Sequence, residues 1–348
     1  MSAGAFSTHV QLNFELFKGD DQKPLFNNVW LQSNAIPAQP KTLEEGDVIH
    51  LCSRPYRCLQ NAVDTQLQNV LSTFNISNSL SPEEKLNQLR ELPASALVKK
   101  IFDFNIHTFR GVTDDEMISS DLISNIHSGA FAVRFKQRGM HILLGEAETE
   151  EILYALTNPP PTSSQEDMLH ALNNYYALPV CESLLSLYTK EGSSADPRVE
   201  SATSLEDGAE KAKQLFGLIT SDVQVRAPIR VLSEALFDGG VSPDRILRYR
   251  VAYRPGCTDR IYPRSFGVTH AADGVSWWYI ERYGFSEAEK EIVKKWLART
   301  LIPLVSGHKQ HEEEPGLEEF LLFKEDGEIE VVKDRHWEWL MRVAEKLG

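Results

Sequence analysis

Three short apolar runs along the chain predict buried β-strands. They are Asn28–Ser33, Met140–Gly145 and Ile246–Tyr253, and the third alternates in part between apolar and polar positions, as a one-sided strand does. Long helical stretches separate the three runs, so the sequence predicts an α/β fold with a mostly parallel sheet. Three strands are few for 348 residues, which indicates either a small, heavily decorated sheet or one that lacks strands.

Helix start signals stand at two places between and after these strands. Ser81–Glu84 supplies an N-cap serine, a proline at the first helical position and a capping-box glutamate. Ser286 and Glu289 repeat the capping box before a helix that is expected to end near Leu304.

Three short segments rich in proline or glycine interrupt the predicted helices and strands, but they do not mark domain boundaries. They lie at 158–161, 192–197 and 311–315, and each is too short to link independent domains, so residues 1–348 are expected to form a single domain. The last segment, 316–348, is expected to form a small hairpin followed by a terminal helix.

The overall composition is that of a globular protein, with 42% apolar and 25% charged residues. Lys and Arg number 36 against 50 Asp and Glu, a net charge of −14, which repels phosphate backbones and argues against a nucleic-acid partner. No apolar run approaches the roughly 18 residues of a transmembrane segment. Met1–Leu12 also lacks the basic start and apolar run of a secretory signal.

Cysteine usage adds an expectation about the cellular compartment. The four cysteines are Cys52, Cys58, Cys181 and Cys257, and none forms a Cys-x-x-Cys pair. Reduced thiols in a cytoplasmic protein are therefore expected, with a Cys52–Cys58 disulfide as the alternative.

The chain begins with half of a serine nucleophile motif. Ser2-Ala3-Gly4 matches the second half of Gly-x-Ser-x-Gly, which places a serine on a sharp turn before a helix. An amphipathic helix is expected directly after it, with Val10, Phe14 and Phe17 on one side. An ordinary chain terminus is the alternative interpretation of so short a motif.

An acid and a histidine follow the second and third predicted strands. Glu150 lies within Gly145–Glu151, and His270 ends the loop Gly267–His270. Taken alone, the acid would suit the solvated first turn of a helix and the histidine a structural hydrogen bond. With Ser2 they stand in the order Ser…Glu…His, the chain order of α/β-hydrolase triads, at the strand ends where such sheets place their sites.

Two further groups of residues offer alternatives. Asp222 is a second candidate for the acid, although Ser221-Asp222 also suits the start of a helix. His308 and His311, beside Glu312–Glu314, have spacing that could chelate a metal, whereas an exposed acidic loop explains them more simply.

From Ser2 to about Leu347 the chain resembles the type-B carboxylesterase family, which includes carboxylesterases, lipases and cholinesterases. The similarity is carried by Ser2–Ala5, Trp30–Ser33, Leu89–Ala94, Leu144–Glu150 and Phe266–His270, of which the last is the most specific. The resemblance implies an α/β-hydrolase fold and the hydrolysis of a small-molecule or lipid ester without a cofactor.

The resemblance also implies a role for each site residue. Ser2 would attack the ester carbonyl, His270 would carry the proton, and Glu150 would orient the imidazole. The Ala3 N–H would be one donor of the oxyanion hole.

The resemblance begins only at the nucleophile turn, and this implies an N-terminally truncated chain. The first strands and the Gly-rich oxyanion loop would be missing, and 46–58 would be an insertion without counterpart. We therefore expect a partial α/β-hydrolase fold with an open sheet edge beside Asn28–Ser33. The alternative function is that of a catalytically inert hydrolase-fold fragment or an interaction module.

Overall fold

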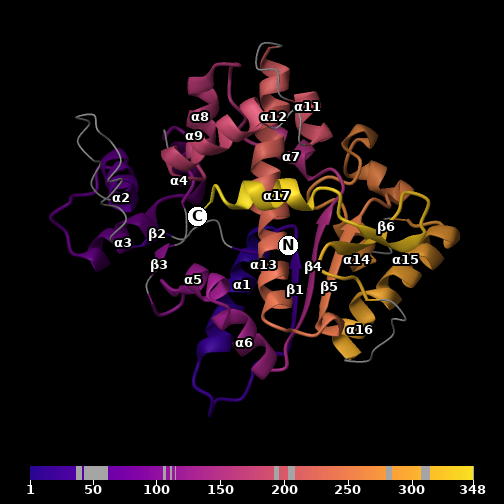
Figure 1. Ribbon diagram of the computed structural model, residues 1–348. Coiled ribbons are helices and arrows are strands. Elements are labelled where there is room, and N and C mark those ends of the chain that lie inside the picture. The colour runs from indigo at the N-terminus through magenta and orange to yellow at the C-terminus, as the bar shows by residue number, and fades with distance from the viewer. Residues whose placement is uncertain are drawn as a thin grey trace. The chain divides into compact units, whose positions relative to one another are not determined.

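The computed structural model describes residues 1–36, 41–42, 62–104, 107–109, 112–113, 115–191, 196–202, 208–279, 284–306 and 314–347 (Figure 1). The chain divides into two compact units. One comprises Met1–Ala38, Asp121–Leu172 and Ala177–Gly348, and the other comprises Gln39–Ser120 and Asn173–Tyr176. The predicted insertion at 46–58, with Cys52 and Cys58, lies outside the described residues.

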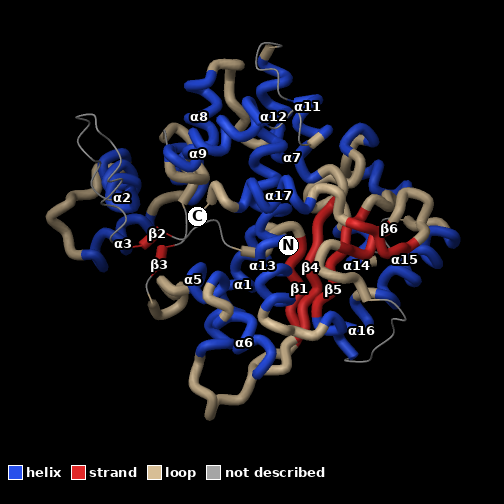
Figure 2. The backbone as a smooth tube through the Cα atoms, viewed as in Figure 1, coloured by secondary structure: helices blue, strands red, loops and turns tan. Residues whose placement is uncertain are grey.

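The larger unit contains a five-stranded sheet in the order β1-β4-β5-β6-β7 (red in Figure 2). Its strands are β1 (Asn28–Gln32), β4 (His141–Ala147), β5 (Ile246–Val251), β6 (Glu319–Phe323) and β7 (Ile329–Lys333). The first four are parallel, and only β7 runs antiparallel to its neighbour. This confirms the predicted α/β class, and the three strands read from the sequence are neighbours in the expected order.

Helices cover both faces of this sheet. The larger unit contains α1 (Ala3–Phe17), α5 (Leu122–His127), α6 (Ala130–Gln137), α7 (Glu150–Leu156), α8 (Gln165–Asn173), α9 (Leu178–Ser186), α11 (Pro197–Ala202), α12 (Ala209–Ser221), α13 (Ala227–Asp238), α14 (Gly274–Trp278), α15 (Glu287–Arg299), α16 (Leu301–Ser306) and α17 (Trp337–Ala344). The C-terminal hairpin β6–β7 joins the main sheet, and α17 follows it.

The smaller unit consists mainly of helices. It contains α2 (Ala62–Thr73), α3 (Pro82–Glu91), α4 (Ala94–Ile101) and a short parallel pair, β2 (Lys41–Thr42) with β3 (Val112–Thr113). The capping box predicted before α3 is confirmed, since Ser81 Oγ accepts from the Glu84 amide and the Glu84 carboxylate accepts from the Ser81 amide.

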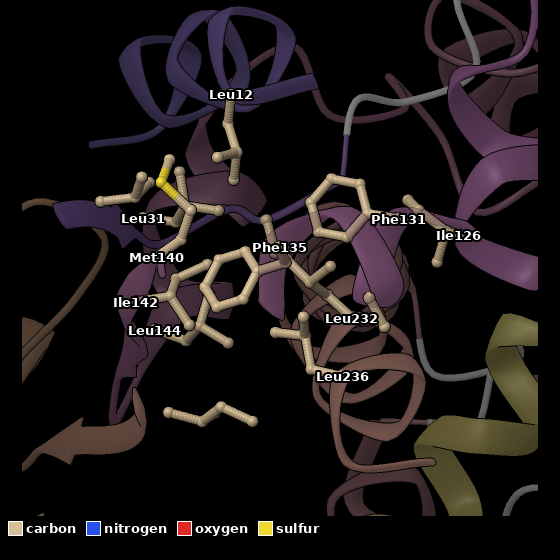
Figure 3. Packing of buried hydrophobic residues seen from close by; sticks show 14 of the residues in the cluster. Leu12, Leu31, Ile126, Phe131, Phe135, Met140, Ile142, Leu144, Leu232 and Leu236 are labelled. Carbon is tan, nitrogen blue, oxygen red and sulfur yellow. The ribbon is translucent and has the colours of Figure 1, made fainter. Parts of the chain in front are cut away.

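One hydrophobic cluster joins α1, α6 and α13 to the face of β1 and β4. Leu12 and Leu31 meet Phe135 and Leu144 there, and each is fully buried (Figure 3). The opposite face carries a second cluster around the buried indole of Trp296, which stacks on Phe323. Because both faces are covered, the parallel strands read as apolar runs in the sequence.

Two helix predictions need correction. Val10 is buried as expected, but Phe14 and Phe17 are 48% and 38% exposed. Residues spaced three and four apart around Leu12 and Leu16 form the buried side of α1 instead. The helix after Ser286 begins with its predicted capping box, but it ends at Arg299, and α16 is a separate helix.

A π-helical turn, Asp222–Arg226, joins α12 to α13 without a break in the chain path. Pro228 follows within the first turn of α13. Proline has no N–H to donate to the preceding turn, and its ring crowds the carbonyl of that turn, so a wider turn accommodates it. The expectation that Asp222 begins a helix is therefore wrong.

Strand β1 is the outer strand of the described sheet. The Asn27 carbonyl and the Ser33 amide bond to β4 at 2.8 and 2.7 Å. Since a parallel strand alternates its bonding side, the backbone groups of Asn28 and Trp30 point to the other side. No described strand pairs with that side, so β1 is an edge strand among the described residues, and an open edge in the whole chain stays a prediction. Any cover from 46–58 lies outside the described residues.

Candidate active site

Ser2 occupies a tight turn at the carboxyl end of β1. Its φ of 51° and ψ of −123° lie in a region that residues with a side chain rarely adopt. The Ser2 N–H donates to the Gln32 carbonyl at 2.8 Å, and the Ser2 carbonyl accepts from the Ala5 amide at 2.9 Å, which opens α1. The Ala3 N–H belongs to the first helical turn, whose amides have no carbonyl partner within the helix.

Glu150 is the first residue of α7 and is fully buried. Its Oε2 lies 2.6 Å from Nδ1 of His270, and its Oε1 accepts from the Ala147 amide at 2.8 Å. Burial alone would favour the neutral acid, but the His270 imidazole and the Ala147 amide outweigh it, so the pKa of Glu150 stays below its ordinary value. The contact that the sequence led us to expect is therefore present, with an ionised carboxylate.

His270 gains affinity for a proton from this partner. Burial lowers the pKa of the imidazole, but the adjacent Glu150 carboxylate raises it further, and the net direction is upward. The positive charge of the Met1 amine acts in the opposite sense on His270, which places the start of the chain close to the imidazole. The Tyr154 ring packs against the imidazole with 5.0 Å between centroids.

The loop that carries Glu150 and the loop that carries His270 are hydrogen-bonded directly to each other. Thr149 and Thr269 form an isolated parallel bridge, and Thr149 Oγ1 donates to the Phe266 carbonyl at 2.7 Å. Gly267 has a φ of +55°, and a Cβ atom there would lie 2.9 Å from Thr149 Oγ1. A glycine is therefore required for this close approach, which aligns the carboxylate and the imidazole.

Asp273 is a site residue that the sequence analysis missed. Its side chain is buried, and its Oδ2 accepts from Gln32 Nε2 at 2.7 Å and from Trp277 Nε1 at 3.0 Å. Burial and the neighbouring Glu150 charge raise the pKa of Asp273 to about 6. The sequence did offer one signal for Asp273, which stands three residues after His270. Residues three apart in a turn lie close together, so an acid at this spacing could have been placed near the imidazole.

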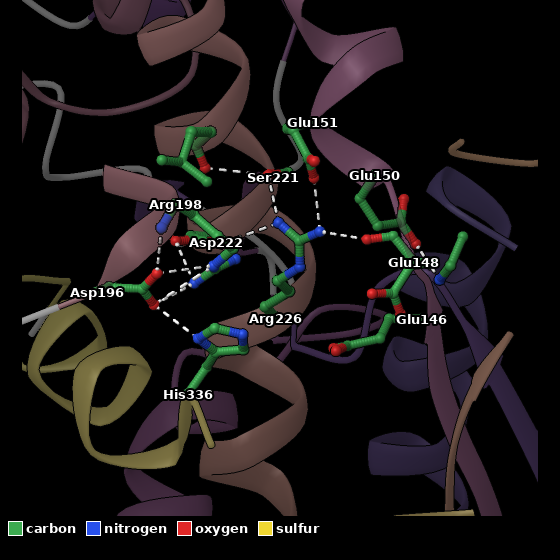
Figure 4. A network of polar contacts seen from close by, with 12 residues as sticks. Glu146, Glu148, Glu150, Glu151, Asp196, Arg198, Ser221, Asp222, Arg226 and His336 are labelled. Carbon is green, nitrogen blue, oxygen red and sulfur yellow. Dashed lines mark hydrogen bonds and ion pairs between the residues drawn. The ribbon is translucent and has the colours of Figure 1, made fainter. Parts of the chain in front are cut away.

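Asp222, the alternative acid, does not serve His270. Its carboxylate accepts from the Tyr188 hydroxyl at 2.8 Å and pairs with Arg198 and Arg226 at 3.0 and 3.1 Å. Figure 4 shows Arg226 between Asp222 and the residues around Glu150. The guanidinium of Arg226 also bonds to Glu151 and to the carbonyl of residue 148, so it holds the start of α7 from both sides of Glu150.

A second group of ion pairs joins α13 to strands β4 and β5. Arg230 is fully buried and reaches Glu146 at 2.6 Å and Asp334 at 2.8 Å. Arg248 meets the same Asp334 at 2.6 Å, and Arg250 meets Glu146. These paired charges satisfy one another in the interior, which is the condition for burying them.

Within the described residues, no group of three or more His, Cys, Asp or Glu side chains could hold a metal ion. His308 and His311 lie outside those residues. Cys181 and Cys257 are both buried. Among the described helices, none combines the length and apolar character needed to cross a membrane.

No family model matches the chain. The chain is 33% identical over 344 residues to an uncharacterized esterase/lipase of Schizosaccharomyces pombe, covering 99% of this chain and 58% of that protein. It is 29% identical over 340 residues to a carboxylic ester hydrolase of Gibberella moniliformis, covering 97% of this chain and 57% of that protein. The chain therefore spans a little over half the length of these relatives.

A solved structure of a PNB esterase superimposes on this chain. The TM-score is 0.61 at 17% sequence identity, and the match covers 99% of this chain and 62% of that one. The fold of this chain is therefore α/β-hydrolase-like.

Proposed function

We propose that this chain carries the catalytic residues of a serine carboxylic-ester hydrolase of the type-B carboxylesterase family. The buried pair of Glu150 and His270 carries the proposal, because it lies at the end of the sheet where the turn of Ser2 opens α1. The names of the two relatives, esterase/lipase and carboxylic ester hydrolase, support the same reaction.

In the proposed reaction Ser2 Oγ attacks the ester carbonyl. His270 takes the hydroxyl proton on Nε2, since Nδ1 faces Glu150, and gives it to the leaving alcohol. Water then attacks the acyl-serine with His270 again as the base, which releases the acid and restores Ser2. Glu150 stays ionised throughout and stabilises the imidazolium that forms at each step.

The oxyanion of the tetrahedral intermediate would lie at the amino end of α1. The Ala3 N–H supplies one donor there, aided by the partial positive charge of the helix terminus. Loss of one such donor typically lowers the rate by ~10²–10³.

The test is turnover of p-nitrophenyl butyrate by the chain and by its Ser2→Ala and His270→Ala variants. Ser7→Ala and His127→Ala are matched controls, since both side chains are exposed in the same unit. Loss of hydrolysis in the first pair alone supports the proposal. A fluorophosphonate probe followed by mass spectrometry detects a reactive Ser2 even when turnover is slow.

The second candidate function is that of an inert hydrolase-fold module, which the open edge of β1 favours. Equal background rates in all five proteins, with no probe on Ser2, would support this alternative. The same outcome would contradict the proposed hydrolysis by this chain, whereas activity regained in a longer version would assign the reaction to that version.

A further inference from the structure

We propose that Asp273 is a positioning residue that holds the Ser2 turn in register with His270 through the side chain of Gln32. This inference rests on the proposed function, because it assigns a role toward the same nucleophile and base. Neither the motif of the nucleophile turn nor the order of acid and histidine points to Asp273.

Gln32 connects Asp273 to the nucleophile turn. Its side-chain amide donates to Asp273 Oδ2 at 2.7 Å, and its backbone carbonyl accepts the Ser2 N–H at 2.8 Å. Gln32 is the last residue of β1 and is 2% exposed, so the strand holds its backbone while Asp273 holds its side chain. A displacement of Asp273 is therefore transmitted to the residue that orients Ser2.

Asp273 is fixed on its other side to the histidine loop. The Ala272 amide donates to the Thr269 carbonyl at 2.8 Å, which closes the turn between His270 and Asp273. Trp277 donates its indole N–H to Asp273 Oδ2 at 3.0 Å. That indole is itself buried among other aromatic rings, so Asp273 has little freedom to move relative to His270.

The charge of Asp273 acts on the same site. The titratable groups that face it are the Met1 amine, Glu150, His270 and Tyr249. Its carboxylate favours the protonated imidazole, and it acts against the burial that lowers the pKa of the Met1 amine, while Glu150 opposes the ionisation of Asp273. Oδ1 of Asp273 has no hydrogen-bond partner among the described residues, so the carboxylate is not neutralised by a paired cation there.

The experiment separates the charge from the mechanical link. Asp273→Asn keeps the shape and an acceptor for Gln32 but removes the charge, so His270 should titrate at lower pH in NMR spectra of histidine labelled with ¹³C. Gln32→Met removes the link but keeps the charge, so labelling of Ser2 by a fluorophosphonate should slow by about tenfold through lost alignment. Asp326→Asn, on an exposed turn, should change neither measurement.

A merely structural role for Asp273 predicts a different result. Both variants would then lower the melting temperature but leave the titration of His270 and the labelling rate of Ser2 unchanged, and that outcome overturns the inference. If Ser2 of the unaltered chain does not react with the probe, the proposed function fails. In that case the NMR shifts of the Ser2 and Ala3 backbone amides decide the inference without turnover: they should move in Gln32→Met and stay in place in Asp326→Asn, and unchanged shifts in Gln32→Met overturn it.

Discussion

The Glu150 carboxylate and the His270 imidazole meet at 2.6 Å although 120 residues separate them along the chain. Each residue lies immediately beyond a threonine, and these threonines, Thr149 and Thr269, bridge the two loops. Backbone contacts between the loops therefore hold Glu150 and His270 together in addition to the attraction between their side chains. Because the loops stay bonded without that attraction, a substitution of Glu150 that preserves side-chain size can measure its effect on catalysis.

Glu150→Gln should lower kcat/KM by about 10²–10⁴ with little effect on folding. The amide preserves the size of the side chain, but it removes the charge that favours the imidazolium. Ester hydrolysis and the melting temperature should be measured together. Glu148→Gln is the matched control, since that residue is 42% exposed on the same loop, and equal losses in both variants would rule out a special role for Glu150.

His9 should make the folded state sensitive to acid. Its imidazole is buried in the core against the Phe131 ring, and burial lowers its pKa from 6.5 to about 4. Between pH 6.5 and pH 4 the His9 imidazole is protonated in the unfolded chain but neutral in the folded one. Stability that is fully present above pH 6.5 is therefore lost as the pH falls toward 4. The loss should be roughly 3 kcal/mol at full protonation of the unfolded state.

The test for His9 is the free energy of unfolding by urea as a function of pH. His9→Leu should flatten the curve between pH 6.5 and 4, whereas His127→Leu, at an exposed position, should leave its slope unchanged. A slope that survives His9→Leu would show that other groups cause the acid sensitivity.

Arg226→Met should destabilise the protein and disturb the active site together. The change removes the buried partner of Asp222 and Glu151, and breaking such a pair typically costs ~3–5 kcal/mol. Arg264→Met is the control, because Arg264 is 83% exposed in its pair with Asp259 and should contribute below about 1 kcal/mol. Similar urea midpoints for the two variants would contradict the prediction.

The open edge of β1 can be tested with two prolines one residue apart. Asn28→Pro removes an amide that points away from β4, so it should slow aggregation and leave stability nearly unchanged. Val29→Pro removes an amide on the bonded side and should cost about 3 kcal/mol or more. Light scattering measures aggregation, and urea unfolding measures stability. An unchanged aggregation rate in Asn28→Pro would mean that chains do not associate through the edge of β1.

Local signals in the sequence predicted the strands and the capping boxes because both depend on nearby residues. The order of Ser2, Glu150 and His270 likewise follows from where each strand ends. The buried side of α1 was misjudged because hydrophobicity favoured Phe14 and Phe17, whereas the packing surface selects His9 and Asn13. The contacts of Asp222 and Asp273 escaped prediction because each acid joins a partner four residues away to a partner from another part of the chain, such as Arg198 or Gln32.

The turn at Asp222–Arg226 has a consequence for the phase of the long helical segment 209–238. One extra residue per turn shifts everything after it by about 100° around the axis and 1.5 Å along it. Arg230, which follows the turn, therefore faces Glu146 and Asp334 because α13 is out of phase with α12. Deleting one residue from the turn would restore an ideal helix, yet it would rotate the Arg230 guanidinium away from both carboxylates.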